Sequence, residues 1–63
     1  MTRDAVFVAK ETALSALGLS QDEIGREQIY LRGDGSVEFF FSSPGGEDLA
    51  HIMVDSEGNA RAL

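Results

Sequence analysis

Glycine-containing turn segments recur through the second half of the sequence and constrain its fold more than any other feature. Between them, apolar and polar residues alternate. Alternation with a period of two indicates strands that bury one face, and short glycine-rich connections between such strands are typical of antiparallel hairpins. The turn segments lie at residues 33–36, 43–46 and 55–59. They predict a meander of three to four strands, at residues 28–32, 37–42, 49–54 and 60–63.

The first part of the chain has a helical period instead. Apolar residues recur there at intervals of three to four, which predicts a helix over residues 4–17. Thr2 or Asp4 can supply its N-cap. Gly18 is suited to end the helix in a left-handed conformation, with Leu19 folding back against the last turn. The apolar set comprises Val6, Ala9, Ala13, Leu14 and Leu17.

A second, short helix is predicted directly after the first. Ser20 and Glu23 have the spacing of a capping box, and Leu19 and Ile24 occupy the two positions of a hydrophobic staple. Gly25 weakens the interior of this helix, which we expect to end before the first strand. A plain polar turn is the alternative.

These elements define an α+β fold: an N-terminal helix, a short second helical turn, and an antiparallel three- to four-stranded meander packed on the helix. With 63 residues the chain has room for a single domain, residues 1–63. Its 43% hydrophobic content is that of a folded domain. Because the sequence contains no cysteine, apolar packing must hold the core together.

Strand alternation sorts the apolar residues into two faces of the sheet. We expect the first helix to cover one face, which collects Ile29, Leu31, Val37, Phe39, Phe41, Ala50, Ile52 and Val54. The other face collects Tyr30, Phe40, Leu49, His51 and Met53, among Gln28, Arg32, Glu38 and Ser42. One helix cannot cover both faces, so this second set is predicted to bind a partner. Alternatively, the C-terminal residues or the short helix fold over it, or these apolar side chains are exposed without any role.

The sequence offers no recognisable catalytic arrangement. His51 is the natural candidate for acid–base chemistry, but it lies in the middle of a predicted strand with no nucleophile suggested nearby. Residues 55–59 superficially resemble a calcium loop yet lack the terminal glutamate, so a hairpin turn with Gly58 or Asn59 at positive φ is predicted. We therefore expect no enzyme activity, no catalytic residue, no metal site and no cofactor.

Charge limits the partners of the chain. Eleven acidic and five basic side chains give a formal net charge of −6, which repels nucleic-acid phosphates and anionic membranes. We expect no direct nucleic-acid binding and no membrane association. The apolar stretch at residues 5–9 is too short for a secretory signal, which predicts a cytoplasmic protein, or a secreted one if the chain is excised from a longer precursor.

Three groups of residues give the chain a resemblance to a known family. They are Ala5, Ala9 and Ala13 in the helix, Asp34 and Gly35 before a strand, and residues 54–58 near the end. With these features the chain resembles the PepSY family, small domains in which an alanine-rich helix precedes an antiparallel hairpin. The resemblance implies an inhibitory or regulatory interaction module rather than an enzyme, in a family whose members are largely secreted or membrane-linked.

Two functions follow from these features. The first is a non-enzymatic protein-binding module that uses the sheet face of Tyr30, Phe40, Leu49, His51 and Met53, with aromatic side chains as anchors. Its partner is another protein or a second copy of the chain, which would form a homodimer. The alternative is an acidic inhibitor that blocks the basic nucleic-acid-binding groove of a partner protein by charge mimicry.

Overall fold

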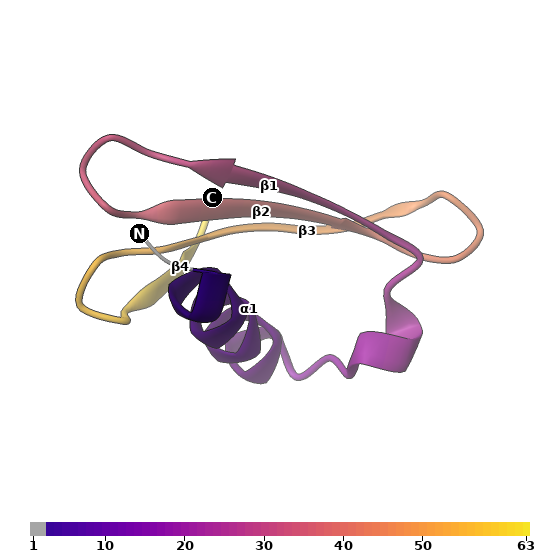
Figure 1. The fold of residues 1–63 in the computed structure, drawn as a ribbon. Helices are drawn as coiled ribbons and strands as arrows, with labels where there is room; N and C mark the ends of the chain where they lie inside the picture. Colours follow the sequence, from indigo (N-terminus) through magenta and orange to yellow (C-terminus); the bar gives the residue numbers. More distant parts are fainter. Residues whose placement is uncertain (1–2) are drawn as a thin grey trace.

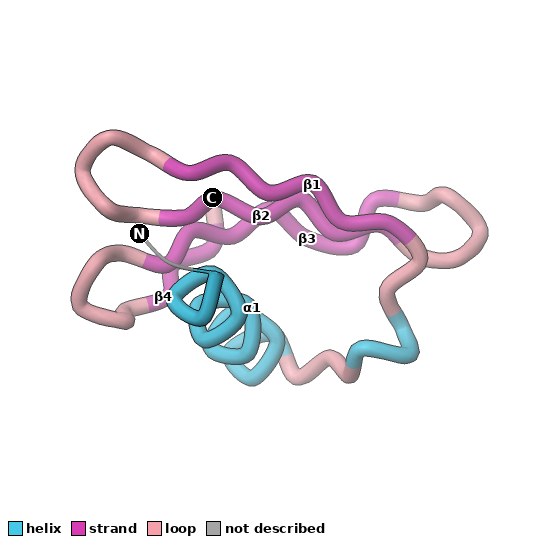
Figure 2. The backbone as a smooth tube through the Cα atoms, viewed as in Figure 1, coloured by secondary structure: helices cyan, strands magenta, loops and turns pink. Residues whose placement is uncertain are grey.

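Residues 3–63 fold into one helix and one antiparallel sheet, joined by a single 3-10 turn (Figure 1; Figure 2). The structure, a computed structural model, describes residues 3–63, with side chains from Ala5 onward. The strands follow each other across the sheet in the order β1-β2-β3-β4, which confirms the predicted α+β fold and meander. The elements are α1 (Arg3–Leu17), η1 (Gln21–Glu23), β1 (Arg26–Leu31), β2 (Val37–Ser42), β3 (Asp48–Val54) and β4 (Ala60–Ala62).

Helix α1 ends where the sequence predicts. Gly18 has a φ of 71°, and the backbone N–H of Leu19 donates to the carbonyl of Leu14 at 3.0 Å. This bond closes a Schellman motif and turns the partly buried Leu19 side chain back onto the core. At the other end, Asp4 lies inside the helix rather than capping it, and Thr2 lies outside the described residues.

The second predicted helix is the single 3-10 turn η1. The Glu23 carboxylate accepts hydrogen bonds from the Ser20 backbone N–H at 3.0 Å and from its hydroxyl at 3.2 Å. Leu19 and Ile24 both pack against the core, as a hydrophobic staple requires. The predicted role of Gly25 in the helix is wrong, because η1 ends at Glu23 and Gly25 lies just before β1.

The three hairpin turns share one geometry. In each turn the glycine N–H donates to the carbonyl of the residue three positions earlier, over 2.9 to 3.1 Å. Gly35, Gly46 and Gly58 have φ values of 91°, 92° and 88°, which a residue with a Cβ rarely adopts. This is the three-residue hairpin loop with a glycine in the left-handed region, and it confirms Gly58 as the predicted positive-φ residue.

The core lies between α1 and the two central strands. Phe39 pairs with Ile52 and Val37 with Val54 across β2 and β3, and the rings of Phe39 and Phe41 stack at 5.5 Å between centroids. All five of these side chains are buried, as predicted for the helix-facing side. From the helix, Ala9, Ala13 and Leu14 complete the core. We call this side of the sheet the inner face.

The inner face is not covered along its whole width. Helix α1 packs mainly against β2, β3 and β4, and β1 extends beyond it (Figure 1). The prediction that Ile29 and Leu31 belong to the core is therefore wrong, because their side chains are 39% and 58% exposed. An ion pair of 3.1 Å between Lys10 of α1 and Glu27 of β1 bridges the gap.

Candidate functional site: the outer face of the sheet

The strand register places the predicted binding residues together on the side of the sheet opposite to α1, which we call the outer face. Phe40 lies opposite both Gln28 of β1 and His51 of β3. The Tyr30 ring meets the Phe40 ring edge to face at 5.6 Å, and the His51 ring stacks on Phe40 at 3.9 Å between centroids. Three rings from three neighbouring strands thus form one continuous row.

The other two predicted residues extend this row. Leu49 is the extra residue at a β-bulge in β3, and it borders a shallow hollow together with Phe40 and His51. Met53 follows two positions after His51 and therefore points to the same side. The structure brings all five predicted residues onto one face, where Tyr30 is 49% exposed.

A buried carboxylate lies in the middle of the outer face. Glu38 is only 9% exposed, and its two oxygens accept hydrogen bonds from different partners. Arg32 donates from Nη2 to Oε1 at 2.7 Å, and Nε2 of His51 contacts Oε2. These contacts satisfy the buried carboxylate, which would otherwise destabilise the fold. Sequence reasoning placed Glu38 on this face but missed its central position.

The contact with Glu38 also bears on whether His51 could act as an acid–base catalyst. Its Nε2 is engaged by the carboxylate, and its ring face is covered by Phe40. Both contacts fix the orientation of the imidazole. Among the described residues no serine, threonine or lysine is hydrogen-bonded to His51, so the arrangement supports a positioning role rather than nucleophilic catalysis.

A further apolar residue joins the outer face from the C-terminus. The backbone N–H of Leu63 donates to the carbonyl of His51 at 2.9 Å, which holds Leu63 beside β3. Its side chain is 56% exposed. The sequence predicted a strand through residue 63, whereas β4 ends at Ala62. Continuing the β3–β4 register by one residue places Leu63 opposite His51, in agreement with this hydrogen bond.

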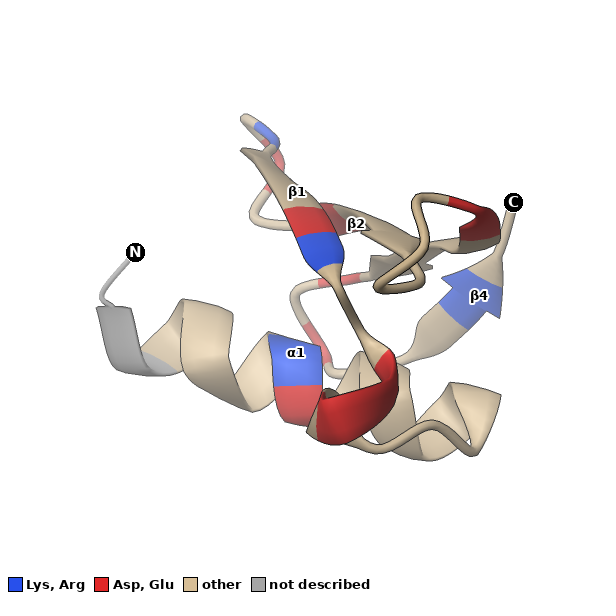
Figure 3. Cartoon of the chain, turned by 90° about the vertical axis from the view of Figure 1, so that its right-hand side faces the viewer, with Lys and Arg blue, Asp and Glu red and all other residues tan. Residues whose placement is uncertain are grey.

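Basic side chains surround the outer face although the chain as a whole is acidic. Arg32 bonds to Glu38, Arg26 lies opposite Ser42, and Arg61 lies opposite Met53. These arginines account for three of the five basic residues in the sequence. Figure 3 shows the basic positions on β1 and β4. The outer face is therefore an apolar, aromatic surface with three arginines at its margins and one carboxylate, that of Asp48, beside the hollow at Leu49.

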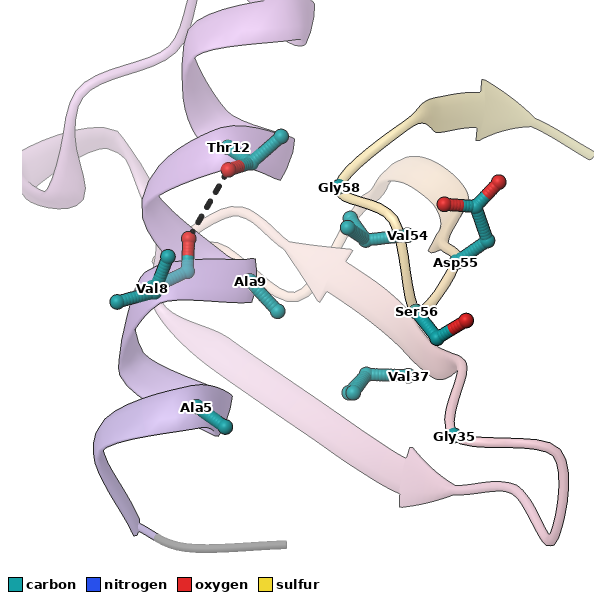
Figure 4. A pocket seen from close by; sticks show the side chains of 10 residues that line it. All are labelled: Ala5, Val8, Ala9, Thr12, Gly35, Val37, Val54, Asp55, Ser56 and Gly58. Carbon is teal, nitrogen blue, oxygen red and sulfur yellow. Dashed lines mark hydrogen bonds between the residues drawn. The ribbon is translucent and has the colours of Figure 1, made fainter.

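A second hollow lies on the opposite side of the molecule and was not predicted. It has a volume of about 500 Å³ and lies between α1 and two hairpin turns (Figure 4). Ala5, Val8 and Thr12 line its helix side, where the Thr12 hydroxyl donates to the Val8 carbonyl at 3.1 Å. The Asp55 carboxylate at its margin accepts backbone hydrogen bonds within its own turn. The hollow is thus mainly apolar and offers no evident reactive group.

The described residues hold neither a metal-ligand cluster nor a membrane-spanning helix, and comparison with known proteins finds no match. Within residues 3–63 no cluster of three or more histidine, aspartate or glutamate side chains could hold a metal ion. Neither α1 nor η1 has the length and apolar character needed to cross a bilayer. No family model, no curated protein and no solved structure matches this chain.

Proposed function

We propose that this chain is a non-enzymatic protein-binding module that recognises its partner with the outer face of the sheet. The observation that carries the proposal is the continuous row of Tyr30, Phe40 and His51, which no helix covers within the described residues. Exposed apolar surface of this kind usually marks an interaction site. Aromatic side chains bury large areas at a low entropic cost and are frequent anchors of interfaces.

The fixed polar groups of the outer face support recognition of a particular kind of partner. Glu38 holds Arg32 and His51 in place, so both side chains are oriented before a partner arrives. Such preorganisation lowers the entropic cost of binding. Arg26 and Arg61 add positive charge at the margin. A partner with an apolar centre and acidic residues around it would complement this surface. The regulatory or inhibitory role implied by the PepSY resemblance is compatible with such a module.

The test is affinity capture from a lysate of the source cells with tagged wild-type chain and two variants. Phe40→Glu places a charge in the middle of the aromatic row. Val8→Glu is the matched control, because Val8 is exposed on α1, away from the outer face. We expect Phe40→Glu to reduce capture at least tenfold and Val8→Glu to retain it. Circular dichroism must show that both variants are folded, and undiminished capture by folded Phe40→Glu would refute the proposal.

Salt dependence separates the proposal from the acidic-inhibitor alternative. Exposed charges are screened within a Debye length of about 8 Å at physiological ionic strength, so a charge mimic should lose its partner as salt is added. An apolar, aromatic interface should keep it. The same capture at low and at high salt therefore decides between the two functions. Capture that disappears with salt but survives Phe40→Glu would favour the inhibitor.

A further inference from the structure

The outer edge of β1 has no neighbouring strand within the described residues, because β1 is first in the sheet order and pairs only with β2. An open edge presents unpaired backbone N–H and C=O groups that can pair with another strand. Proteins often protect such edges with proline, bulges or charge. Arg26 and Glu27 at the start of β1 carry charge, but its second half ends in Ile29, Tyr30 and Leu31 and contains no proline. This edge is therefore suited to pairing.

The inner-face side chains beside this edge are uncovered. The side chains of Ile29 and Leu31 point to the inner face, but α1 does not cover them. Phe7, which is 57% exposed, lies three residues before Lys10, and Lys10 contacts Glu27 of β1. Residues three apart share one side of a helix, so Phe7 lies on the flank of α1 nearest to β1. Apolar side chains are therefore exposed both on β1 beside its open edge and on the flank of α1 that faces β1.

The hydrogen-bond pattern shows which backbone groups are directed outward. The N–H of Arg32 donates to the carbonyl of Ser36 at 2.9 Å, so these two residues form a hydrogen-bonded pair at the end of the β1–β2 ladder. Hydrogen-bonded and non-bonded pairs alternate in an antiparallel ladder. Even-numbered residues of β1 therefore direct their backbone groups to β2. Ile29 and Leu31 direct theirs to the open edge.

We propose that the open edge of β1 binds β1 of a second copy of this chain, antiparallel and about a two-fold axis at Tyr30. In this register Ile29 lies opposite Leu31 of the second copy, and Leu31 opposite its Ile29. These two pairs exchange about four backbone hydrogen bonds. On the outer face Tyr30 meets Tyr30 of the second copy, and Gln28 meets its Arg32. The sheet then continues from one copy into the other.

Neighbouring registers are less complementary. An axis at Ile29 places Arg26 opposite Arg32 of the second copy, and like charges directly opposite each other are destabilising. An axis at Leu31 places Ile29 opposite Gly33, so the inner face loses apolar contacts. The Tyr30 register pairs apolar with apolar residues and opposes no like charges. Because the edge is complementary to itself in this register, the strand that pairs with it is β1 of a second copy of the chain.

Cysteine cross-linking tests the register, because the chain has no cysteine of its own. Tyr30→Cys places a thiol on the axis, in a non-hydrogen-bonded pair whose Cα atoms lie about 4.5 Å apart, within reach of a disulfide. Gln28→Cys is the matched control on the same face of β1, with the two thiols about 13 Å apart along the strands. We expect disulfide-linked dimers of Tyr30→Cys alone. Equal or faster cross-linking of Gln28→Cys, or none of Tyr30→Cys, would overturn the proposal.

Sedimentation equilibrium tests the association without an introduced thiol. We expect the wild-type chain to dimerise and Leu31→Lys to weaken the dimer at least tenfold, since the lysine would oppose the apolar side chain of Ile29. Leu31 is exposed in the monomer, so this change should leave the fold intact. Phe40→Glu should remain dimeric, which separates this edge from the outer-face site. A wild-type monomer at millimolar concentration, or a dimer lost only in Phe40→Glu, would overturn the proposal.

Discussion

Among the glycines, Gly25 is the one at which an added Cβ would come closest to other backbone atoms. A Cβ added there would lie 2.3 Å from Cα of Pro44, 2.5 Å from its nitrogen and 2.6 Å from the carbonyl oxygen of Ser43. All three are backbone atoms, which cannot rotate away as a side chain would. Gly25 thus allows the chain to enter β1 while its N–H donates to the Ser42 carbonyl at 2.7 Å.

Replacing Gly25 by alanine should therefore destabilise the fold. We expect Gly25→Ala to lower the free energy of unfolding by about 3 kcal/mol, because the backbone must shift to relieve the clash. Gly33→Ala is the matched control: nothing lies within 4 Å of its added Cβ and its φ is not positive. That change should leave stability unchanged or raise it by about 0.5 kcal/mol. Urea unfolding of both variants measures the difference, and equal stability would contradict the clash.

At the scale of elements, two of the hairpin turns are held by carboxylates. The hydroxyl of Ser36 donates to Asp34 at 2.6 Å, and this bond is the main cause that lowers the pKa of Asp34 below its ordinary 3.8. The backbone N–H of Asn59 donates to Asp55 at 2.9 Å and is the main cause that lowers the pKa of Asp55. Both turns therefore bind the ionised carboxylate better than the protonated one.

Acid should weaken these turns. Because both pKa values are lower in the folded than in the unfolded chain, the stabilising contribution is nearly complete above about pH 5 and is lost progressively as the pH falls through the folded pKa values. We expect the melting temperature of the wild-type chain to fall between pH 5 and pH 2. The double variant Asp34→Asn, Asp55→Asn should show a flatter profile, measured by circular dichroism. An equally steep decline in the double variant would show that other carboxylates cause it.

The elements themselves were largely predictable from local sequence. The positive-φ glycines of the three turns and Gly18 at the end of α1 define where the elements stop, and period-two alternation assigns the faces of β2 and β3. Alternation cannot show how far a helix reaches across a sheet, so the exposure of Ile29 and Leu31 was not predictable. The central position of Glu38 depends on side-chain pairing across strands, which the sequence does not encode locally.

At the scale of the whole molecule, incomplete coverage of the sheet is the feature that links both proposed interactions. A helix of 15 residues packs over three strands and leaves the second half of β1 and the outer face without a covering helix among residues 3–63. A domain of about 60 residues buries only about 60% of its unfolded surface, so its stability is marginal. Pairing of two copies along β1 would bury further apolar surface and add to that stability.

Because pairing of two copies would stabilise the folded chain, the melting temperature should depend on protein concentration. While the dimer dominates, each tenfold increase in concentration should raise the melting temperature by about 5 °C, because unfolding then includes dissociation. Added salt should raise it further, since two chains of net charge −6 repel each other and salt screens the repulsion. In Leu31→Lys the concentration dependence should be weaker and should begin only at higher concentration. Calorimetry from about 10 μM to 1 mM measures both effects, and a wild-type melting temperature that is independent of concentration would contradict edge pairing.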